Sequence, residues 1–269
     1  MSAEPLLRIR GGGLSFGERQ LWSGLDLDVA PGEFIAVLGA NGTGKSSLLK
    51  SILGQQRLST GMIEIGGSVA RRGDRRLGYI PQQRIIPEGT PVRARDLVMM
   101  GLNGHRFGPP LPRRGERERV DDALAEVGAT DYANSPVGVL SGGEQQRLRA
   151  AQALVARPEL LLCDEPLLSL DLHHQRAICD LIDHRRHRDG TATLFVTHDI
   201  NPVFGMVDRV LYLADRAFLI GTPDEVLRSD VLSDLYGTPV EVVHAAGRVL
   251  VVGAPDRHAE HGPSTGSAQ

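Results

Sequence analysis

The fold of this 269-residue chain is decided by one stretch, Gly39-Ala40-Asn41-Gly42-Thr43-Gly44-Lys45-Ser46-Ser47. It fits the pattern G-x-x-x-x-G-K-S/T and lies between an apolar run at 34–38 and a helix-forming segment. Glycines let successive backbone N–H groups point at phosphate oxygens, and a helix N-terminus adds partial positive charge. Lys45 can then reach the β- and γ-phosphates of a nucleotide, and the Ser46 hydroxyl can bind Mg²⁺. The stretch predicts a strand, a phosphate-binding loop and a helix, in that order.

The alternative for this stretch is a plain glycine-rich turn. Such a turn explains one or two glycines, but it does not explain a lysine and a hydroxyl after the third. Lys45 and Lys50 are the only lysines among the 30 basic residues of the chain. A compact ammonium group fits between phosphates better than the broad, planar guanidinium group of arginine. The rare lysine at position 45 therefore favours phosphate binding.

The composition restricts the class of protein. The length suits one large domain with a subdomain. A net charge of −3 and the lack of a basic stripe argue against nucleic acid as a partner. Two cysteines, Cys163 and Cys179, are too few for a disulfide scaffold and indicate a reducing compartment. The chain lacks a stretch of about 18 apolar residues and a signal-peptide pattern at 1–5, so we expect any membrane role to come through partners.

The order of apolar runs predicts an α/β fold with a mixed, mostly parallel sheet and flanking helices. Short apolar runs and turns at 6–38 predict an N-terminal antiparallel β region that leads into the phosphate-loop strand. Helical spacing of apolar residues predicts an inserted helical subdomain at about 92–156. Residues 254–269 are polar, and we expect a disordered tail there.

Individual elements follow from the same patterns. We expect strands at 62–65, 77–80, 160–163, 193–197, 210–213 and 218–220, helices at 45–54, 92–100, 120–127, 172–188, 223–228 and 230–236, and a closing hairpin at 240–244 and 249–252.

An uninterrupted apolar strand ends in two acids in the stretch Leu160-Leu161-Leu162-Cys163-Asp164-Glu165. Such a strand is buried on both faces in a parallel sheet, and ligands bind at the carboxyl ends of these strands. Asp164 can hold Mg²⁺ directly or through water, and Glu165 can act as the base that orients an attacking water. Acids at a strand end are often structural, and it is the phosphate loop that favours catalysis here.

A second helix start has the sequence Leu140-Ser141-Gly142-Gly143-Glu144-Gln145-Gln146-Arg147. Ser141 as N-cap and Glu144 three residues later fit a helix capping box. A cap does not explain Gly142 and Gly143, since each costs roughly 1 kcal/mol relative to Ala within a helix. Adjacent glycines suit close approach of the backbone to an anion. We expect both functions: the cap orients a helix whose N-terminus faces phosphate.

Together and in this order, the motifs resemble those of the ATP-binding cassette (ABC) ATPases, the nucleotide-hydrolysing subunits of ABC transporters. Residues 39–46 are similar to the Walker A motif of that family, residues 140–147 to its signature, and residues 160–165 to Walker B. The resemblance implies a P-loop NTPase core and a single ATPase domain over residues 1–253, with its RecA-like part at about 6–91 and 157–253.

The resemblance also gives roles to residues that are ordinary by themselves. Gln82 after Pro81 matches the Q-loop, Asp171 the D-loop, His198 the switch histidine, and Phe16 the aromatic residue that stacks on adenine. Without the family, Gln82 would be a polar loop residue, Phe16 a core aromatic residue, and His198 a surface or core histidine.

The site expected from the resemblance therefore has three groups of residues. The catalytic residues are Glu165, His198 and Gln82. The ATP-binding residues are Phe16, Gly39, Ala40, Asn41, Gly42, Thr43, Gly44, Lys45, Ser46, Ser47, Ser141, Gly142, Gly143 and Asp171. The Mg²⁺ ligands are Ser46, Gln82 and Asp164.

The resemblance implies a head-to-tail homodimer in which each ATP lies between one subunit's phosphate loop and the other's signature. It further implies two integral-membrane permease subunits, an extracytoplasmic binding protein for an importer, and a place at the cytoplasmic face of the cell membrane. We expect the permease to dock on the loop at 82–87, with Ile85 and Ile86 as candidate contacts. The alternative for both isoleucines is ordinary subdomain core.

Three stretches, at 197–203, 221–227 and 235–240, look like the zinc/manganese-uptake branch of the family. The alternatives are the ATPase of an iron-chelate or siderophore importer, an exporter ATPase, or a soluble ABC ATPase without a transport role. A P-loop kinase would leave residues 140–147 unexplained. The histidines at 173, 174, 184 and 187 lie on a polar helix, where solvent exposure is a simpler interpretation than metal sensing.

Overall fold

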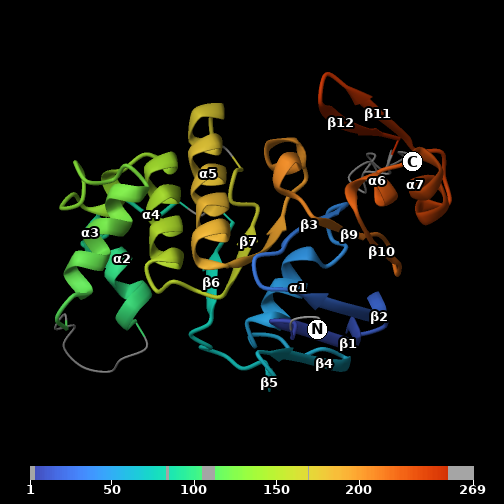
Figure 1. Ribbon diagram of the computed structural model, residues 1–269, viewed down its shortest axis with the longest axis horizontal. Coiled ribbons are helices and arrows are strands. Elements are labelled where there is room, and N and C mark those ends of the chain that lie inside the picture. Colours follow the sequence, from blue (N-terminus) through green and yellow to red (C-terminus); the bar gives the residue numbers. More distant parts are fainter. Residues whose placement is uncertain (1–3, 83–84, 105–112, 169, 254–269) are drawn as a thin grey trace, which may run out of the picture.

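The phosphate-loop strand lies in the middle of a six-stranded sheet (Figure 1). The structure is a computed structural model that describes residues 4–82, 85–104, 113–168 and 170–253. In spatial order the strands are β10 (Phe218–Gly221), β9 (Arg209–Leu213), β3 (Phe34–Gly39), β8 (Ala192–Val196), β7 (Leu160–Asp164) and β6 (Leu77–Ile80). Each neighbouring pair from β9 to β6 is parallel, and β10 is antiparallel to β9. Every residue of β7 and β8 is buried, as expected for central strands covered on both faces.

A second, antiparallel sheet covers one side of this core. Its strands, in spatial order, are β2 (Arg19–Val29), β1 (Leu7–Phe16), β4 (Thr60–Ile65) and β5 (Ser68–Val69). Helix α1 (Lys45–Ile52) packs with both sheets through Leu48, Leu49 and Ile52, which share a core with strands of each sheet. The helix that carries the phosphate-loop lysine is therefore fixed from two sides.

Helices form a layer at the other end of the molecule (Figure 1). They are α2 (Ala94–Asn103), α3 (Glu116–Glu126) and α4 (Gly142–Leu154), with a short 3₁₀ turn, η1 (Val137–Val139), before α4. Helix α5 (Leu172–Asp189) lies between this layer and the sheet, and residues of α4, α5 and the sheet share one apolar core.

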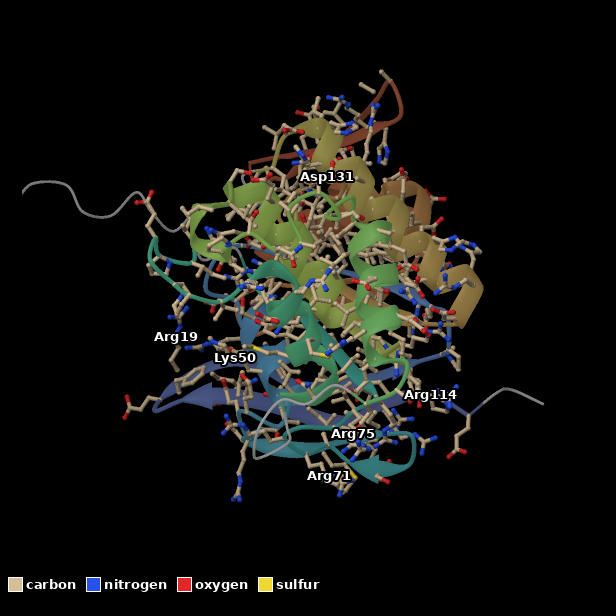
Figure 2. All side chains as sticks on the ribbon, turned by 90° about the vertical axis from the view of Figure 1, so that its left-hand side faces the viewer. Arg19, Lys50, Arg71, Arg75, Arg114 and Asp131 are labelled. Atoms are coloured by element: carbon tan, nitrogen blue, oxygen red, sulfur yellow. The ribbon has the colours of Figure 1, made fainter. Side chains whose placement is uncertain are left out.

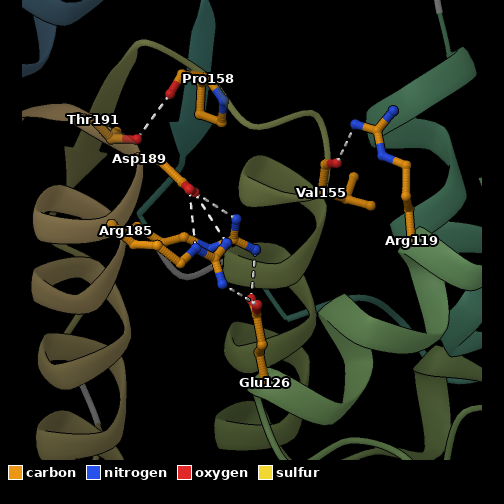
Figure 3. Close-up of polar contacts among 8 residues, drawn as sticks. Arg119, Glu126, Val155, Pro158, Arg185, Asp189 and Thr191 are labelled. Atoms are coloured by element: carbon orange, nitrogen blue, oxygen red, sulfur yellow. Dashed lines mark hydrogen bonds and ion pairs between the residues drawn. The ribbon is translucent and has the colours of Figure 1, made fainter.

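A polar joint also ties α5 to the helical layer (Figure 3). Arg185 of α5 is 5% exposed and forms ion pairs with Glu126 of α3 and, at 2.9 Å, with Asp189. Arg188 adds a further contact to Glu126. A buried guanidinium group needs such partners, because an unpaired buried charge is strongly destabilising.

The last part of the chain returns to the sheet. It contains η2 (Asn201–Met206), α6 (Pro223–Val226), α7 (Ser229–Tyr236) and the hairpin β11 (Glu241–Ala245) and β12 (Arg248–Val252). The Asn201 amide donates to the Val249 carbonyl at 2.9 Å and accepts from the Val249 N–H at 2.8 Å. These bonds fasten the hairpin to the segment that follows His198.

The expected fold class is confirmed, including the antiparallel N-terminal region. Strands β1 and β2 are longer than the apolar runs at 6–10 and 25–29 predict, and β1 continues through register shifts at Gly11-Gly12-Gly13 to Phe16. Helix α3 begins at Glu116, earlier than the apolar spacing predicts, and α6 ends at Val226. The expected tail at 254–269 lies outside the described residues. Among the described residues, none of the helices combines the length and apolar character that crossing a membrane requires.

Candidate functional site

Backbone geometry makes the phosphate loop dependent on glycine. Gly39 has φ 134° and Gly44 has φ 99°, and both values are unfavourable for residues with a side chain. A Cβ atom on Gly39 would lie 2.0 Å from the Leu213 carbonyl oxygen, and one on Gly44 would lie 2.7 Å from Trp22 Nε1. Glycine at these two positions therefore allows the loop to bend tightly and to lie close to β9 and β2.

Lys45 is held inside the loop by the backbone. Its Nζ donates to the carbonyl oxygens of Gly39 at 2.6 Å and Ala40 at 3.0 Å, and the residue is 6% exposed. Burial lowers the pKa of the Lys45 ammonium group, and the nearby carboxylates of Glu165 and Asp164 oppose that shift. A desolvated cation in a glycine-lined loop fits a phosphate group, which would supply the opposite charge.

Ser46 and Asp164 bring two kinds of oxygen together at the end of β7. The Ser46 hydroxyl donates to Asp164 Oδ1 at 2.8 Å, and the Tyr79 hydroxyl donates to Asp164 Oδ2 at 3.4 Å. Asp164 is 5% exposed. Hydroxyl and carboxylate oxygens are the ligands that Mg²⁺ prefers, so this donor set fits that ion.

The other two predicted catalytic side chains, those of Gln82 and His198, both lie close to Glu165. Gln82 Nε2 donates to Glu165 Oε2 at 3.4 Å, and His198 Nδ1 lies 3.9 Å from the same oxygen. Glu165 has φ 47°, an unfavourable conformation for a residue with a side chain. Such strain concentrates at functional sites, where it orients a side chain. Glu165 directly follows the buried strand β7 and precedes a turn. Its side chain therefore lies at the edge of the sheet where the parallel strands end.

Gln82 and Glu165 border a cavity of about 420 Å³, a size typical of small-molecule sites. Its lining consists of Phe16, Arg19, Leu21, Asn41, Gly42, Gly44, Lys45, Ser46, Ser47, Gln82 and Glu165. A larger cleft of about 790 Å³ lies beside the hairpin β11–β12 and touches Gly39, Ala40 and His198, but Lys45 and Ser46 do not line it. We assign the nucleotide to the smaller cavity because it contains the cation and the hydroxyl.

The helix start at Ser141 is a complete capping box. Glu144 Oε2 accepts hydrogen bonds from the Ser141 N–H at 2.8 Å and from its hydroxyl at 2.7 Å, and the Glu144 N–H donates back to Ser141 Oγ at 3.3 Å. The hydroxyl bond lowers the pKa of the Glu144 carboxyl. Ser141, Gly142 and Gly143 do not line the cavity that contains Lys45.

Asp171 lies beside this second helix start rather than beside Lys45. It caps α5, accepting from the His174 N–H at 2.9 Å and pairing with His174 Nδ1 at 2.6 Å. The His174 N–H lowers the pKa of the Asp171 carboxyl. A Cβ on Gly143 would lie 3.9 Å from His174 Nδ1. The predicted residues therefore form two groups within one chain: one around the 420 Å³ cavity and one at the starts of α4 and α5.

Comparison with known proteins decides the family. The family model described as "ABC transporter" matches residues 22–168, which is more than half of the chain. The manganese transport system ATP-binding protein MntB of Halalkalibacterium halodurans is 31% identical over 92% of this chain and 98% of its own length. The chain belongs to the ABC transporter family.

A further relative and two solved structures agree with this assignment. The zinc import ATP-binding protein ZnuC of Roseobacter denitrificans is 33% identical to this ABC protein over 87% of the chain and 85% of its own length. An inward-facing metal-chelate type ABC transporter matches with a TM-score of 0.77 and 26% identity, over 92% of this chain and 96% of the other. A dimeric ATP-binding cassette bound to ADP and Pi matches with a TM-score of 0.69 and 27% identity, over 80% of this chain and 98% of the other.

This ABC protein is thus a nucleotide-binding ATPase subunit, since the ATP-binding subunits of the family hydrolyse ATP for transport. The family's transporter complexes include permease subunits, and their ATPase subunits are peripheral to the membrane.

Three residues near the predicted site were not expected from the sequence. Tyr79 contacts Asp164, Arg19 Nη2 donates to the Gly42 carbonyl at 3.2 Å, and Trp22 packs against Gly44. Tyr79 precedes Gln82 by three residues and lies near the end of its strand, and this position could have indicated that it belongs to the site. Arg19 and Trp22 lie on β2 of the other sheet, and spacing along the chain does not reveal that approach.

Proposed function

We propose that this chain is the ATP-hydrolysing subunit of an importer for a divalent metal ion, zinc or manganese, and works as a homodimer at the cytoplasmic face of the membrane. Its proposed partners are two integral-membrane permease subunits and an extracytoplasmic metal-binding protein. The observation that carries the proposal is the convergence of Lys45, Ser46 and Glu165 on one cavity, in a chain related to MntB and ZnuC.

The proposed domain division keeps one ATPase domain over residues 1–253. Its RecA-like core is at about 6–91 and 157–253, and its helical subdomain is at about 92–156. The mutual packing of α2, α3 and α4 supports this division.

In the proposed complex, residues 39–47 surround the phosphates and Phe16 stacks on the adenine ring. Phe16 is 54% exposed at the edge of the cavity, which leaves an aromatic face free for stacking. Lys45 is already desolvated, so its attraction to phosphate is stronger than it would be in water. Ser46, Asp164 and Gln82 would hold Mg²⁺, which when bound neutralises negative charge on the phosphates.

Glu165 is the proposed general base. It takes a proton from water while the water oxygen bonds to the γ-phosphorus and the bond to the β–γ bridging oxygen breaks, giving ADP and phosphate. Gln82 and His198 orient the carboxylate and the water through the contacts at Glu165 Oε2. Such positioned proton transfer typically contributes about 10²–10⁴ in rate.

The second half of the site is proposed to come from another copy of the chain. Ser141, Gly142 and Gly143 lie away from the cavity of their own subunit but present the N-terminus of α4, which attracts phosphate. Asp171 belongs to the same proposed contact. The dimeric state of the related cassette bound to ADP and Pi supports this arrangement.

The cargo is proposed from the relatives, MntB and ZnuC, and from the three stretches that look like the zinc/manganese branch. Import of a metal chelate is a second candidate, because the inward-facing structure with a TM-score of 0.77 is a metal-chelate type transporter.

ATP-dependent association tests the shared site. The Glu165→Gln variant should be a monomer of 29.0 kDa without nucleotide and a dimer with ATP and Mg²⁺, measured by light scattering. Adding Gly143→Asp should prevent association while ATP binding persists, because the new carboxylate faces phosphate. A Glu165→Gln protein that binds ATP but stays monomeric would contradict the shared site.

Transport assays test the cargo. The chain is purified with its permease subunits and placed in vesicles, and ATP-driven uptake is measured with Zn²⁺, Mn²⁺ or an iron chelate supplied through the binding protein. Uptake of the chelate alone would replace the metal-ion proposal with the second candidate.

A further inference from the structure

The segment that follows Gln82 is fastened to helix α4 by one buried side chain. Gln145 of α4 is 2% exposed, and its Oε1 accepts from the Ile86 N–H at 2.8 Å. Its Nε2 lies 3.4 Å from the Ile86 carbonyl oxygen, so the carboxamide meets both backbone groups of that residue. The side chain therefore replaces a backbone partner for residue 86.

The same amide nitrogen also holds the backbone that precedes the signature. Gln145 Nε2 donates to the carbonyl oxygens of Val137 and Leu140, each at 3.1 Å. Leu140 is the residue directly before Ser141. One carboxamide thus connects Ile86 with the residues that set the direction of the α4 N-terminus.

Close backbone packing makes this connection rigid. A Cβ on Gly138 would lie 2.4 Å from the Pro87 carbonyl oxygen and 3.1 Å from Glu88 Cα, so η1 and residues 87–88 are in direct contact. The Val137 N–H donates to the Val92 carbonyl at 2.8 Å, which joins the residues just before α2 to the same unit. Interiors packed this closely transmit displacement instead of absorbing it.

Ile85 is the exposed end of this connected unit. Its exposed fraction is 75%, whereas Ile86 packs against the core. A partner that pushes on Ile85 therefore acts one residue away from the hydrogen bonds to Gln145.

We propose that Gln145 is a positioning residue that couples the exposed segment at 85–88 to the Ser141–Gly142–Gly143 helix start. Movement of the segment at 85–88 then moves the helix start, and the reverse. When the signature of one copy contacts ATP bound to a second copy, the surroundings of residue 85 therefore change. The inference rests on the proposed dimer. The alternative is that Gln145 only packs in the core. In that case it would stabilise the helical layer without transmitting this change.

Residue 85 can carry a fluorescent label on a single accessible thiol. Cys163 and Cys179 are buried, and burial raises the pKa of both thiols, to about 12 for Cys179, so they react poorly with thiol reagents. In the full-length Glu165→Gln background, Ile85→Cys therefore provides one accessible thiol for an environment-sensitive fluorophore. Light scattering reports the ATP-dependent dimer, and fluorescence reports the surroundings of residue 85 in the same sample.

We expect ATP with Mg²⁺ to produce a dimer and a fluorescence change together. Gln145→Leu, which keeps the approximate volume but removes both hydrogen-bonding atoms, should lose the fluorescence change at ATP concentrations that still give the dimer. The matched control is Gln146→Leu on the same helix, because its amide donates to the Pro166 carbonyl at 3.1 Å instead of to Ile86. This control should keep the change.

A second variant tests the same bond from its other end. Ile86→Pro removes the N–H that donates to Gln145 Oε1 and leaves Gln145 in place. It should also lose the fluorescence change, and it decides the question if Gln145→Leu fails to give a cooperative melting curve.

The outcomes separate the two proposals. Absence of an ATP-dependent dimer in the labelled parent overturns the shared site and the coupling together. A dimer without a fluorescence change overturns the coupling alone, and an unchanged response in folded Gln145→Leu and Ile86→Pro removes the role of Gln145.

Discussion

The phosphate loop and the Ser141 helix start are both glycine-rich helix N-termini, yet their surroundings are opposite. The loop gathers a buried ammonium group, a hydroxyl group and the Glu165 carboxylate around one cavity, and Asp164 accepts a hydrogen bond from that hydroxyl. The Ser141 start has its own Glu144 carboxylate folded back onto the cap, and it contributes no side chain to that cavity. A helix N-terminus alone attracts anions weakly, by roughly 0.3–1 kcal/mol when exposed to solvent.

This difference assigns separate tasks to the two regions. The loop contains the groups needed to bind phosphate and to activate water within one chain. The Ser141 start lacks a cation and a base, so in the proposed dimer it completes a site that another copy has already filled with nucleotide. Removing a group from the loop should therefore affect binding or chemistry directly, and changes at Ser141 should affect association.

The largest effect is expected at Glu165. Glu165→Gln keeps the shape of the side chain but removes the base, so ATP hydrolysis should fall by about 10²–10⁴ while ATP binding persists. Steady-state phosphate release and calorimetric binding measure the two properties. Glu159→Gln is the control: Glu159 is exposed and directly precedes β7 at its opposite end, so this variant should hydrolyse ATP normally. Normal turnover by Glu165→Gln would exclude this residue as the base.

The two lysines of α1 provide the next comparison. Lys45→Ala should weaken ATP binding by about tenfold to a hundredfold, because a charge-assisted hydrogen bond contributes roughly 1.5–3 kcal/mol. Lys50 is exposed on the same helix, and Figure 2 shows it on the same face of the molecule as Arg19. Lys50→Ala should bind ATP with nearly unchanged affinity in calorimetry. Equal affinities for the two variants would remove Lys45 from the phosphate site.

Two glycines with positive φ separate backbone strain from crowding. Gly17 has φ 58° and open space around it, so Gly17→Ala should cost about 1 kcal/mol of unfolding free energy from strain alone. Gly44→Ala adds a clash with Trp22 and Leu21, and overpacking of this kind costs about 1–3 kcal/mol more. Urea unfolding measures both variants. If they lose the same stability, the close approach of β2 to the loop has no energetic consequence.

The smallest effect is expected at Ser141. Ser141→Ala should lower the free energy of unfolding by about 1 kcal/mol at neutral pH. The pKa of Glu144 is lowered in the folded protein, so this contribution is present above the ordinary value of 4.5 and is lost as the pH falls through the lower folded value. Urea unfolding of both proteins at neutral and acidic pH should show the difference shrinking in acid.

A second capping box gives the control for Ser141. Thr222 and Glu225 form the same motif at α6, away from the proposed dimer contact. Thr222→Ala should lose comparable stability but keep ATP-dependent association, whereas Ser141→Ala should weaken it. Equal association of both variants would make the Ser141 box purely structural.

The sequence alone was sufficient for the parts of the fold that depend on local patterns. Short apolar runs predicted β3, β7 and β8, because strands that are buried on both faces are apolar at successive positions instead of alternating with polar residues. The phosphate-loop motif likewise predicted a helix beginning at Lys45. Boundaries were wrong where local chemistry is ambiguous: β1 continues through three consecutive glycines, which ordinarily interrupt a strand.

Contacts between distant segments were harder to predict. Gln145 lies within the 140–147 motif, but the motif does not indicate which groups its carboxamide contacts, so its four contacts with residues 86, 137 and 140 are visible only after folding. Arg19 approaches Gly42 from the other sheet for the same reason. The roles given to Gln82, Asp171 and His198 came from the family, and they stay predictions until the variants are measured.

The Arg185 joint between α5 and α3 has a thermal consequence. Hydration of charged groups becomes less favourable as temperature rises, so the desolvation penalty of a buried ion pair falls on warming. Apolar burial elsewhere in the molecule gains little over the same range. The ion-paired contact between α5 and α3 should thus contribute most to holding the helical layer in place in warm solution, and least in the cold.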